Sequence, residues 1–365
     1  MKEDVMAGAT KKYGFEPDYA IPPGETLREV MESLGMSQKE LARRTDLTVQ
    51  SVNRIFKGTQ PITYETANRL ELATGVPAAM WNNLEAQYRE QLARIHEREK
   101  LQADLDWLKD IPVAELAKRG VLLRAKDKIE QLREVLKFYG VSSVEAWRRI
   151  WETPAVAARR SPCFESEAGP ASAWIRLGEL QARAIDCQPF DKTSFRNALR
   201  QIRNLTREPA HIFAPEMQRL CAESGVALAL VKEMKKVPWN GATKWLTPQK
   251  AMILLCLRGR GEDKFWFSFF HEAGHILYDS KKDLLINDGS QDDPREKRAN
   301  DFAAEFLIPS KYDDTIRRIR SKAEIVRLAD QLDIAPGIVA GRYQFLTGNW
   351  HYFKELIRSL EWADS

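Results

Sequence analysis

Two histidines and a glutamate lie close together in residues 265–279, which read FWFSFFHEAGHILYD. His271 and His275 are four positions apart, so on an α-helix both imidazoles lie on one face, about 40° apart around the axis. Both can therefore bind one metal ion. Glu272 lies about 100° further round and is better placed to contact a water on that ion. The spacing predicts two zinc ligands and a general base on one helical turn.

The residues that flank this motif are almost wholly apolar. Phenylalanine and tryptophan fill positions 265–270 apart from Ser268, and Ile276 and Leu277 follow the second histidine. This pattern predicts a buried helix, in which unpaired histidine and glutamate side chains would be costly. A bound metal ion is the simplest partner for them.

A third ligand is needed, because catalytic zinc sites use three protein ligands and a water. Residues 292–309 predict a helix that Asp293 caps. Glu296 lies three residues before Ala299, beside the apolar face of that helix, so it can point at the metal. Glu305 is the competing candidate, but it lies about 180° round the helix from Glu296 and the two cannot serve one site. Glu296 is therefore the predicted ligand.

Together these residues predict peptide hydrolysis by a zinc-activated water. Zinc lowers the pKa of its bound water towards about 7 and polarises a carbonyl group. Glu272 would take the proton of that water and deliver it to the leaving amine. A further donor should stabilise the oxyanion, and Tyr278, Tyr343 and His351 are candidates among which the sequence does not choose.

The elements that must position this site are a few strands followed by helices. Buried strands are predicted at 226–231 and 251–257, with a turn and a short strand at 240–246 between them. Two more helices are expected at 323–332 and from 336 to about 345. Strands followed by an active-site helix suit a small α+β fold. Upstream, helices are predicted at 112–119, 127–139, 144–151, 172–184, 192–203 and 215–223.

The C-terminal motifs resemble the ImmA/IrrE family of metallopeptidases. The resemblance spans roughly residues 220–345 and is carried by GVALALV, GATKWL, HEAGH, E-x-x-A-N-x-F-A-x-x-F-L-x-P and IAPGIVAGRYQ. It implies that His271, His275 and Glu296 bind zinc and that Glu272 is the catalytic glutamate. The activity it implies is that of a gluzincin-like endopeptidase that cleaves a transcriptional repressor.

Two short helices joined by a tight turn are predicted near the N-terminus. Ser37 caps the first helix and Glu40 completes a capping box, while Thr48 caps the second and Gly58 ends it. Such a pair is typical of a helix-turn-helix, whose second helix enters the major groove of DNA. Glutamine and asparagine on that helix suit adenine edges, arginine suits guanine and lysine suits phosphate. By spacing alone, a plain helical bundle with a solvated polar face fits equally well.

Residues 21 to about 90 resemble the XRE-type DNA-binding domain in the form found in HigA-like antitoxins. SQKELA, IFKG and WNNL are the segments that carry this resemblance. It implies a five-helix domain that binds operator DNA, usually as a homodimer. The residues expected to contact DNA are Gln38, Thr48, Gln50, Ser51, Asn53, Arg54 and Lys57.

The composition is that of an ordinary soluble protein. The chain has 365 residues, of which 44% are hydrophobic and 30% charged, and its net charge of +4 neither demands nor excludes a nucleic-acid partner. Its four scattered cysteines form no CxxC pair, which predicts reduced thiols in a cytoplasmic protein. No apolar run is long enough to span a membrane, so no membrane partner is expected.

We therefore predict a multidomain, mainly α protein. Residues 1–20 would form a flexible arm, 21–92 an all-α helix-turn-helix domain and 93–213 a helical linker or middle domain. Residues 214–365 would form an α+β, zincin-like metallopeptidase domain with a small sheet.

The predicted function is a DNA-binding transcriptional regulator with a zinc-dependent endopeptidase domain. It would cleave a repressor or antitoxin-type protein in a stress, mobile-element or toxin–antitoxin context. The alternative is a non-proteolytic XRE-type regulator or antitoxin, whose metal module senses a ligand or binds a partner.

Overall fold

The structure, a computed structural model, describes residues 19–152, 168–281, 285–286 and 293–363. The chain divides into two compact units, Met1–Leu105 and Asp106–Ser365. Both are rich in helix, and the second unit also contains a small sheet, as predicted for a mainly α, multidomain protein. Residues 1–18 of the predicted N-terminal arm lie outside the described residues. Among the described residues, no helix is both long and apolar enough to cross a bilayer.

The first unit is a helical domain whose short helices begin at the predicted caps. The hydroxyl of Ser37 accepts a hydrogen bond from the backbone N–H of Glu40 (3.2 Å), and that of Thr48 accepts one from Ser51 (3.0 Å). Leu41, Val52 and Trp81 are fully buried in its core. Its helices are α1 (Pro23–Ser33), α2 (Gln38–Arg44), α3 (Val49–Phe56), α4 (Tyr64–Thr74) and α5 (Ala78–Ala103).

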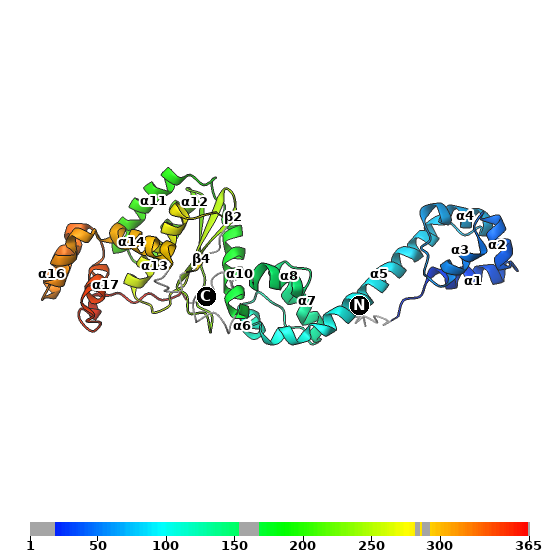
Figure 1. Cartoon of the computed structure of the whole chain (residues 1–365), viewed down its shortest axis with the longest axis horizontal. Coiled ribbons are helices and arrows are strands. Elements are labelled where there is room, and N and C mark those ends of the chain that lie inside the picture. Colours follow the sequence, from blue (N-terminus) through cyan, green and yellow to red (C-terminus); the bar gives the residue numbers. More distant parts are fainter. Residues whose placement is uncertain (1–18, 153–167, 282–284, 287–292, 364–365) are drawn as a thin grey trace, which may run out of the picture. The chain divides into compact units, whose positions relative to one another are not determined.

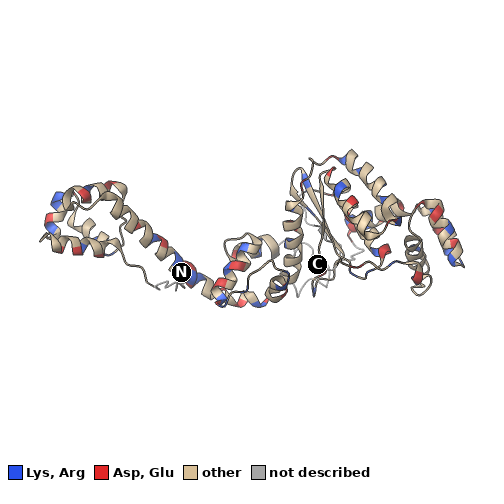
Figure 2. Cartoon of the chain, turned by 180° about the vertical axis from the view of Figure 1, so that it is seen from behind, with Lys and Arg blue, Asp and Glu red and all other residues tan. Residues whose placement is uncertain are grey.

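Helix α5 is 26 residues long and continues without interruption through the predicted boundary between residues 92 and 93. Basic and acidic residues are interspersed along it (Figure 2). Several pair at i, i+4 spacing, including Arg89 with Glu85 and Arg94 with Glu90, both at 2.7 Å. Such pairs support an exposed helix by a few tenths of a kcal/mol each. The division of the chain into four segments stays a prediction.

The second unit begins with η1 (Leu105–Lys109) and a series of helices close to the predicted ranges. One prediction, a helix over 215–223, is wrong at its start, because α12 begins five residues earlier. Pro215 lies inside that helix, where it removes only one hydrogen bond, in the second turn. The added turn buries Phe213 against Phe265 and Trp266. The helices are α6 (Val113–Lys118), α7 (Lys128–Tyr139), α8 (Val144–Trp147), α10 (Ala168–Ala184), α11 (Lys192–Asn204) and α12 (Ala210–Ala222).

The four-stranded sheet has the order β1-β3-β2-β4. Strand β1 (Val226–Leu230) pairs parallel with β3 (Lys250–Leu255), and β2 (Gly241–Thr247) pairs antiparallel with both β3 and the two-residue β4 (Leu285–Ile286). In Figure 1, α10 runs along one side of this sheet, and α12 and α13 (Glu262–Tyr278) lie on the other.

Side chains on β2 and β3 alternate between the two faces of the sheet. Lys244 and Leu254 face α10, where Lys244 pairs with Glu179 and Leu254 packs against Gly178. Thr243 points the other way and bonds to Glu272 of α13. The pleat of β2 therefore directs a hydroxyl at the predicted base.

Helix α13 packs closely against α14 (Pro294–Leu307). Their close approach depends on Gly274, because a Cβ there would lie 3.2 Å from the Cα of Ala299. Asp293 caps α14 as predicted, accepting a hydrogen bond from the N–H of Arg295 (2.8 Å). The unit is completed by α15 (Asp313–Arg317), α16 (Lys322–Leu332) and α17 (Pro336–Thr347).

Candidate metal centre

The structure brings the three predicted metal ligands together. The Nε2 atoms of His271 and His275 are 3.0 Å apart, and each lies 3.1 Å from an oxygen of Glu296. All three side chains are buried. The two histidines come from one turn of α13 and the glutamate from the first turn of α14, so the packing of these two helices builds the group.

The other nitrogen of each imidazole faces an oxygen acceptor. Nδ1 of His271 lies 2.9 Å from Oδ1 of Asn300, and Nδ1 of His275 lies 2.7 Å from Oδ2 of Asp279. Asp279 is held in turn by an ion pair with Arg298. With Nδ1 of each ring donating to these oxygens, each Nε2 would be free to bind a metal ion. Partners of this kind fix the orientation of metal-binding histidines.

These residues fit a bound cation. Two imidazole nitrogens and a carboxylate converge in a buried site, where a positive ion lying among them would satisfy all three. Burial alone would raise the pKa of Glu296, but hydrogen bonds with His271 and His275 outweigh it and bring the pKa to about 2. The ligand atoms are slightly closer than the roughly 3.3 Å separation expected around tetrahedral zinc.

Glu272, the predicted general base, is fully buried beside this group. Its Oε2 accepts a hydrogen bond from the hydroxyl of Thr243 (2.6 Å), while its Oε1 has no hydrogen-bond partner among the described residues. Burial raises the pKa of this carboxyl. The carboxylate packs against Gly241, which has no side chain. A Cβ at that position would lie 2.6 Å from Oε1 and would clash with it.

The structure does not place the other candidate ligand or the candidate oxyanion donors in the metal-binding group. Glu305, the rejected ligand, accepts a hydrogen bond from the backbone N–H of Ser310 (2.9 Å) at the end of α14. Tyr343 is buried against other aromatic rings, whereas Tyr278 and His351 are exposed. The donor for the oxyanion stays unassigned.

Sequence reasoning missed two residues of the site, Asp279 and Asn300. Asp279 lies four positions after His275, and Asn300 lies four positions after Glu296. The i, i+4 spacing was therefore a usable signal, because it places each of them on the same helix face as a ligand.

The residues predicted to contact DNA lie on α2, on α3 and at the two caps of α3. Gln50, Asn53 and Arg54 are exposed on α3, and Lys57 is exposed directly after it, as a reading surface requires. The other three also have structural roles at the junction of the two helices: the side chain of Gln38 donates to the carbonyl of Val49, and the hydroxyls of Thr48 and Ser51 are 3.0 Å apart.

Comparison with known proteins identifies both ends of the chain. Residues 27–81 match the helix-turn-helix family, and residues 230–340 match peptidase family M78, described as the IrrE N-terminal-like domain. The second match contains the whole metal-binding group. The chain is also similar to an uncharacterised HTH-type transcriptional regulator, YddM, of Escherichia coli (strain K12). The two are 30% identical over 63 residues, which cover 17% of this chain and 67% of that relative.

The first match implies DNA binding, and the second suggests a metallopeptidase that acts on a protein substrate. The chain thus belongs to the helix-turn-helix transcriptional regulators through an XRE-type N-terminal domain, and it also carries an IrrE-like peptidase domain in its C-terminal part.

Proposed function

We propose that this protein is a transcriptional regulator whose second unit is a zinc-dependent endopeptidase that cleaves a repressor or antitoxin-type protein. His271, His275 and Glu296 would hold the ion, and Glu272 would act as the base. The first unit would bind operator DNA as a homodimer and so bring the peptidase to proteins that work at a promoter.

The observation that carries this proposal is the position of Glu272. Its Oε1 is fully buried, lacks a hydrogen-bond partner among the described residues and belongs to the residue next to a ligand of the metal-binding group. A structural metal site needs no such group, whereas a hydrolase needs a carboxylate that can exchange a proton with water. Two imidazoles and one carboxylate also form a ligand set that zinc prefers, with a fourth position left for water or substrate.

When bound, zinc would polarise the scissile carbonyl and make a water acidic enough to attack it. The protein's own residues do the rest. Glu272 accepts a proton from the attacking water at Oε1 and delivers it to the leaving nitrogen as the peptide bond breaks. Thr243 donates to Oε2 and keeps the carboxylate turned so that Oε1 is available.

Replacing Glu272 by glutamine tests the peptidase. The amide has almost the same shape but cannot accept the proton, so we expect cleavage to fall by about 10²–10⁴-fold while zinc content stays at the wild-type level. The assay would follow the protein encoded beside this gene by electrophoresis and mass spectrometry. Wild-type protein stripped with a chelator and reloaded with zinc serves as the control. Equal cleavage by wild type and E272Q would refute the peptidase.

Replacing Arg54 by alanine tests the DNA-binding half. Arg54 is exposed on α3, where it can reach a guanine edge, so we expect its loss to weaken binding to the upstream region of the gene by about 1–3 kcal/mol. Arg196, an exposed arginine of α11 in the second unit, provides the matched control for lost charge. Anisotropy titrations at several salt concentrations measure the change. Equal affinities for R54A and R196A would exclude α3 as the reading helix.

A further inference from the structure

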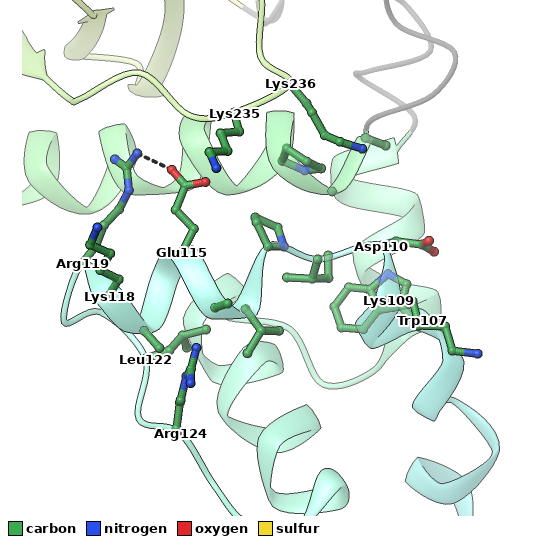
Figure 3. Close-up of a pocket in the computed structure, with 18 of the residues that line it drawn as sticks. Trp107, Lys109, Asp110, Glu115, Lys118, Arg119, Leu122, Arg124, Lys235 and Lys236 are labelled. Atoms are coloured by element: carbon green, nitrogen blue, oxygen red, sulfur yellow. Dashed lines mark hydrogen bonds and ion pairs between the residues drawn. The ribbon is translucent and has the colours of Figure 1, made fainter.

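A large cavity lies in the second unit, formed by residues other than the metal ligands and Glu272. Its volume is about 2000 Å³. Its walls come from η1, α6, the residues that follow α6, the end of α8 with Arg148, the start of α10, and the loop between β1 and β2 (Figure 3). These segments are far apart in the sequence, so the fold alone brings them together.

The lining of this cavity is strongly basic. It contains eight lysines and arginines but only three acidic residues, a local excess of positive charge larger than the net charge of the whole chain. Two of the acids are engaged: Glu115 pairs with Arg119 (2.6 Å), and Glu233 accepts a hydrogen bond from the indole of Trp362 (3.0 Å). Lys118 and Lys235 are exposed and have no ion-pair partner among the described residues.

The cations come from two separate parts of the fold, which form two walls of the cavity. In Figure 3, Lys118 and Arg124 come from α6 and the residues after it, whereas Lys235 and Lys236 come from the β1–β2 loop. Arg119 ties the walls together, because it donates to the backbone carbonyls of Lys232 (3.0 Å) and Glu233 (2.8 Å). Lys236 has a left-handed backbone, with φ of 67°, which is uncommon for a residue with a side chain. The contacts of Arg119 therefore anchor the start of the basic loop to the end of α6.

The size and lining of the cavity favour a polypeptide as its ligand. Sites for small molecules typically measure about 300–1,000 Å³, so a metabolite would leave much of this cavity empty. Proteins that bind single-stranded nucleic acid stack bases on exposed aromatic rings. The aromatic residues of this lining, Trp107 and Trp147, are only 5% and 3% exposed. Apolar side chains such as the exposed Leu123 lie among the cations and suit a mixed acidic and apolar peptide.

We propose that this cavity is an exosite that binds an acidic segment of the polypeptide that the peptidase cleaves. The inference rests on the proposed function and extends it to the class of substrate. The β1–β2 loop leads directly into β2, whose Gly241 abuts the carboxylate of Glu272. Lys236 and Gly241 are five positions apart in the sequence, so their Cα atoms are at most about 18 Å apart. A segment bound by the loop would lie within a short stretch of chain from the catalytic base.

Binding of a fluorescein-labelled poly-glutamate peptide to full-length E272Q protein tests this exosite without turnover. Adding Lys118→Glu and Lys235→Glu reverses one charge on each wall, and we expect affinity to fall by about tenfold. The control adds Arg196→Glu and Lys354→Glu, which make the same change in charge at exposed positions outside the lining. We expect that control to bind within about twofold of the parent, and binding by the parent to weaken as salt is added.

Several results would overturn the exosite. One is that E272Q protein with K118E and K235E added binds the peptide as tightly as E272Q protein alone. Another is that the R196E/K354E control loses as much peptide affinity as K118E/K235E does. A third is tight binding of single-stranded DNA that the wall substitutions abolish while peptide binding persists, which would make the cavity a nucleic-acid site. Thermal melting checks that each variant is folded. If the protein with Lys118→Glu and Lys235→Glu is not folded, Lys118→Gln and Lys235→Gln are used instead. Because the assay involves no cleavage, its failure refutes the exosite alone, whereas cleavage by E272Q refutes the peptidase alone.

Discussion

At the scale of single residues, the ligands of the metal group depend on neighbours that hold them in place. His275 is oriented by Asp279, and Asp279 is fixed in turn by Arg298 of α14. This chain of contacts joins the end of one helix to the middle of the other. The geometry of the group therefore depends on residues that do not bind the ion themselves.

Replacing Asp279 by alanine should weaken zinc binding by about 10–100-fold, because Nδ1 of His275 loses its acceptor and the ring its fixed orientation. Competition with a chromophoric chelator measures the affinity. Asp301→Ala removes an exposed aspartate from the neighbouring helix and should leave the affinity unchanged. Equal affinities in the two variants would show that Asp279 does not position the histidine.

At the scale of elements, α14 must begin at the right residue to present Glu296. Asp293 sets that start: its carboxylate caps the helix and pairs with Arg295 (2.8 Å). The hydrogen bond from Arg295 is the main reason that the pKa of Asp293 lies below its ordinary value of 3.8. Since the folded pKa is lowered, this carboxylate stabilises the fold above its unfolded pKa. The contribution is lost as pH falls through the folded value.

Asp293→Ala should therefore cost about 1 kcal/mol at neutral pH, a typical value for loss of an N-cap. In a unit of this size the melting temperature should fall by about 2 °C. The difference from wild type should shrink once the pH is below the folded pKa of Asp293, because both proteins then lack the charge. Asp293→Asn keeps a good cap and serves as the control. A difference that stays constant down to acidic pH would contradict this account.

The helices were largely predictable because their ends are encoded locally. Ser37, Thr48 and Asp293 cap helices as predicted, and the HEAGH spacing fixed which side chains share a face of α13. Contacts between different helices and strands could not be predicted from such local signals. Asn300 reaches His271 across 29 residues only because α14 packs on α13. The basic cavity could not be predicted at all, since its walls come from separate segments whose approach depends on tertiary packing.

At the scale of the whole molecule, each unit has a hydrophobic core of its own. The first is built around Leu27, Val52 and Trp81, and the second around residues such as Trp266 and Phe269, close to the metal ligands. Separate cores allow separate unfolding. The metal-binding group belongs wholly to the second unit, so bound zinc should stabilise that unit and not the first.

Calorimetry of the full-length protein should therefore show two transitions, only one of which responds to zinc. A ligand present at about 100 times its Kd stabilises the state that binds it by about 2.7 kcal/mol, so a chelator should lower that transition by several degrees. Operator DNA should raise the other transition by the same linkage, which assigns each to its unit. In His275→Ala, which lacks a ligand, the chelator should have little effect on either transition. A single transition would mean that the two units unfold together. Two transitions that both shift with the chelator would mean that metal binding in the second unit also stabilises the DNA-binding unit.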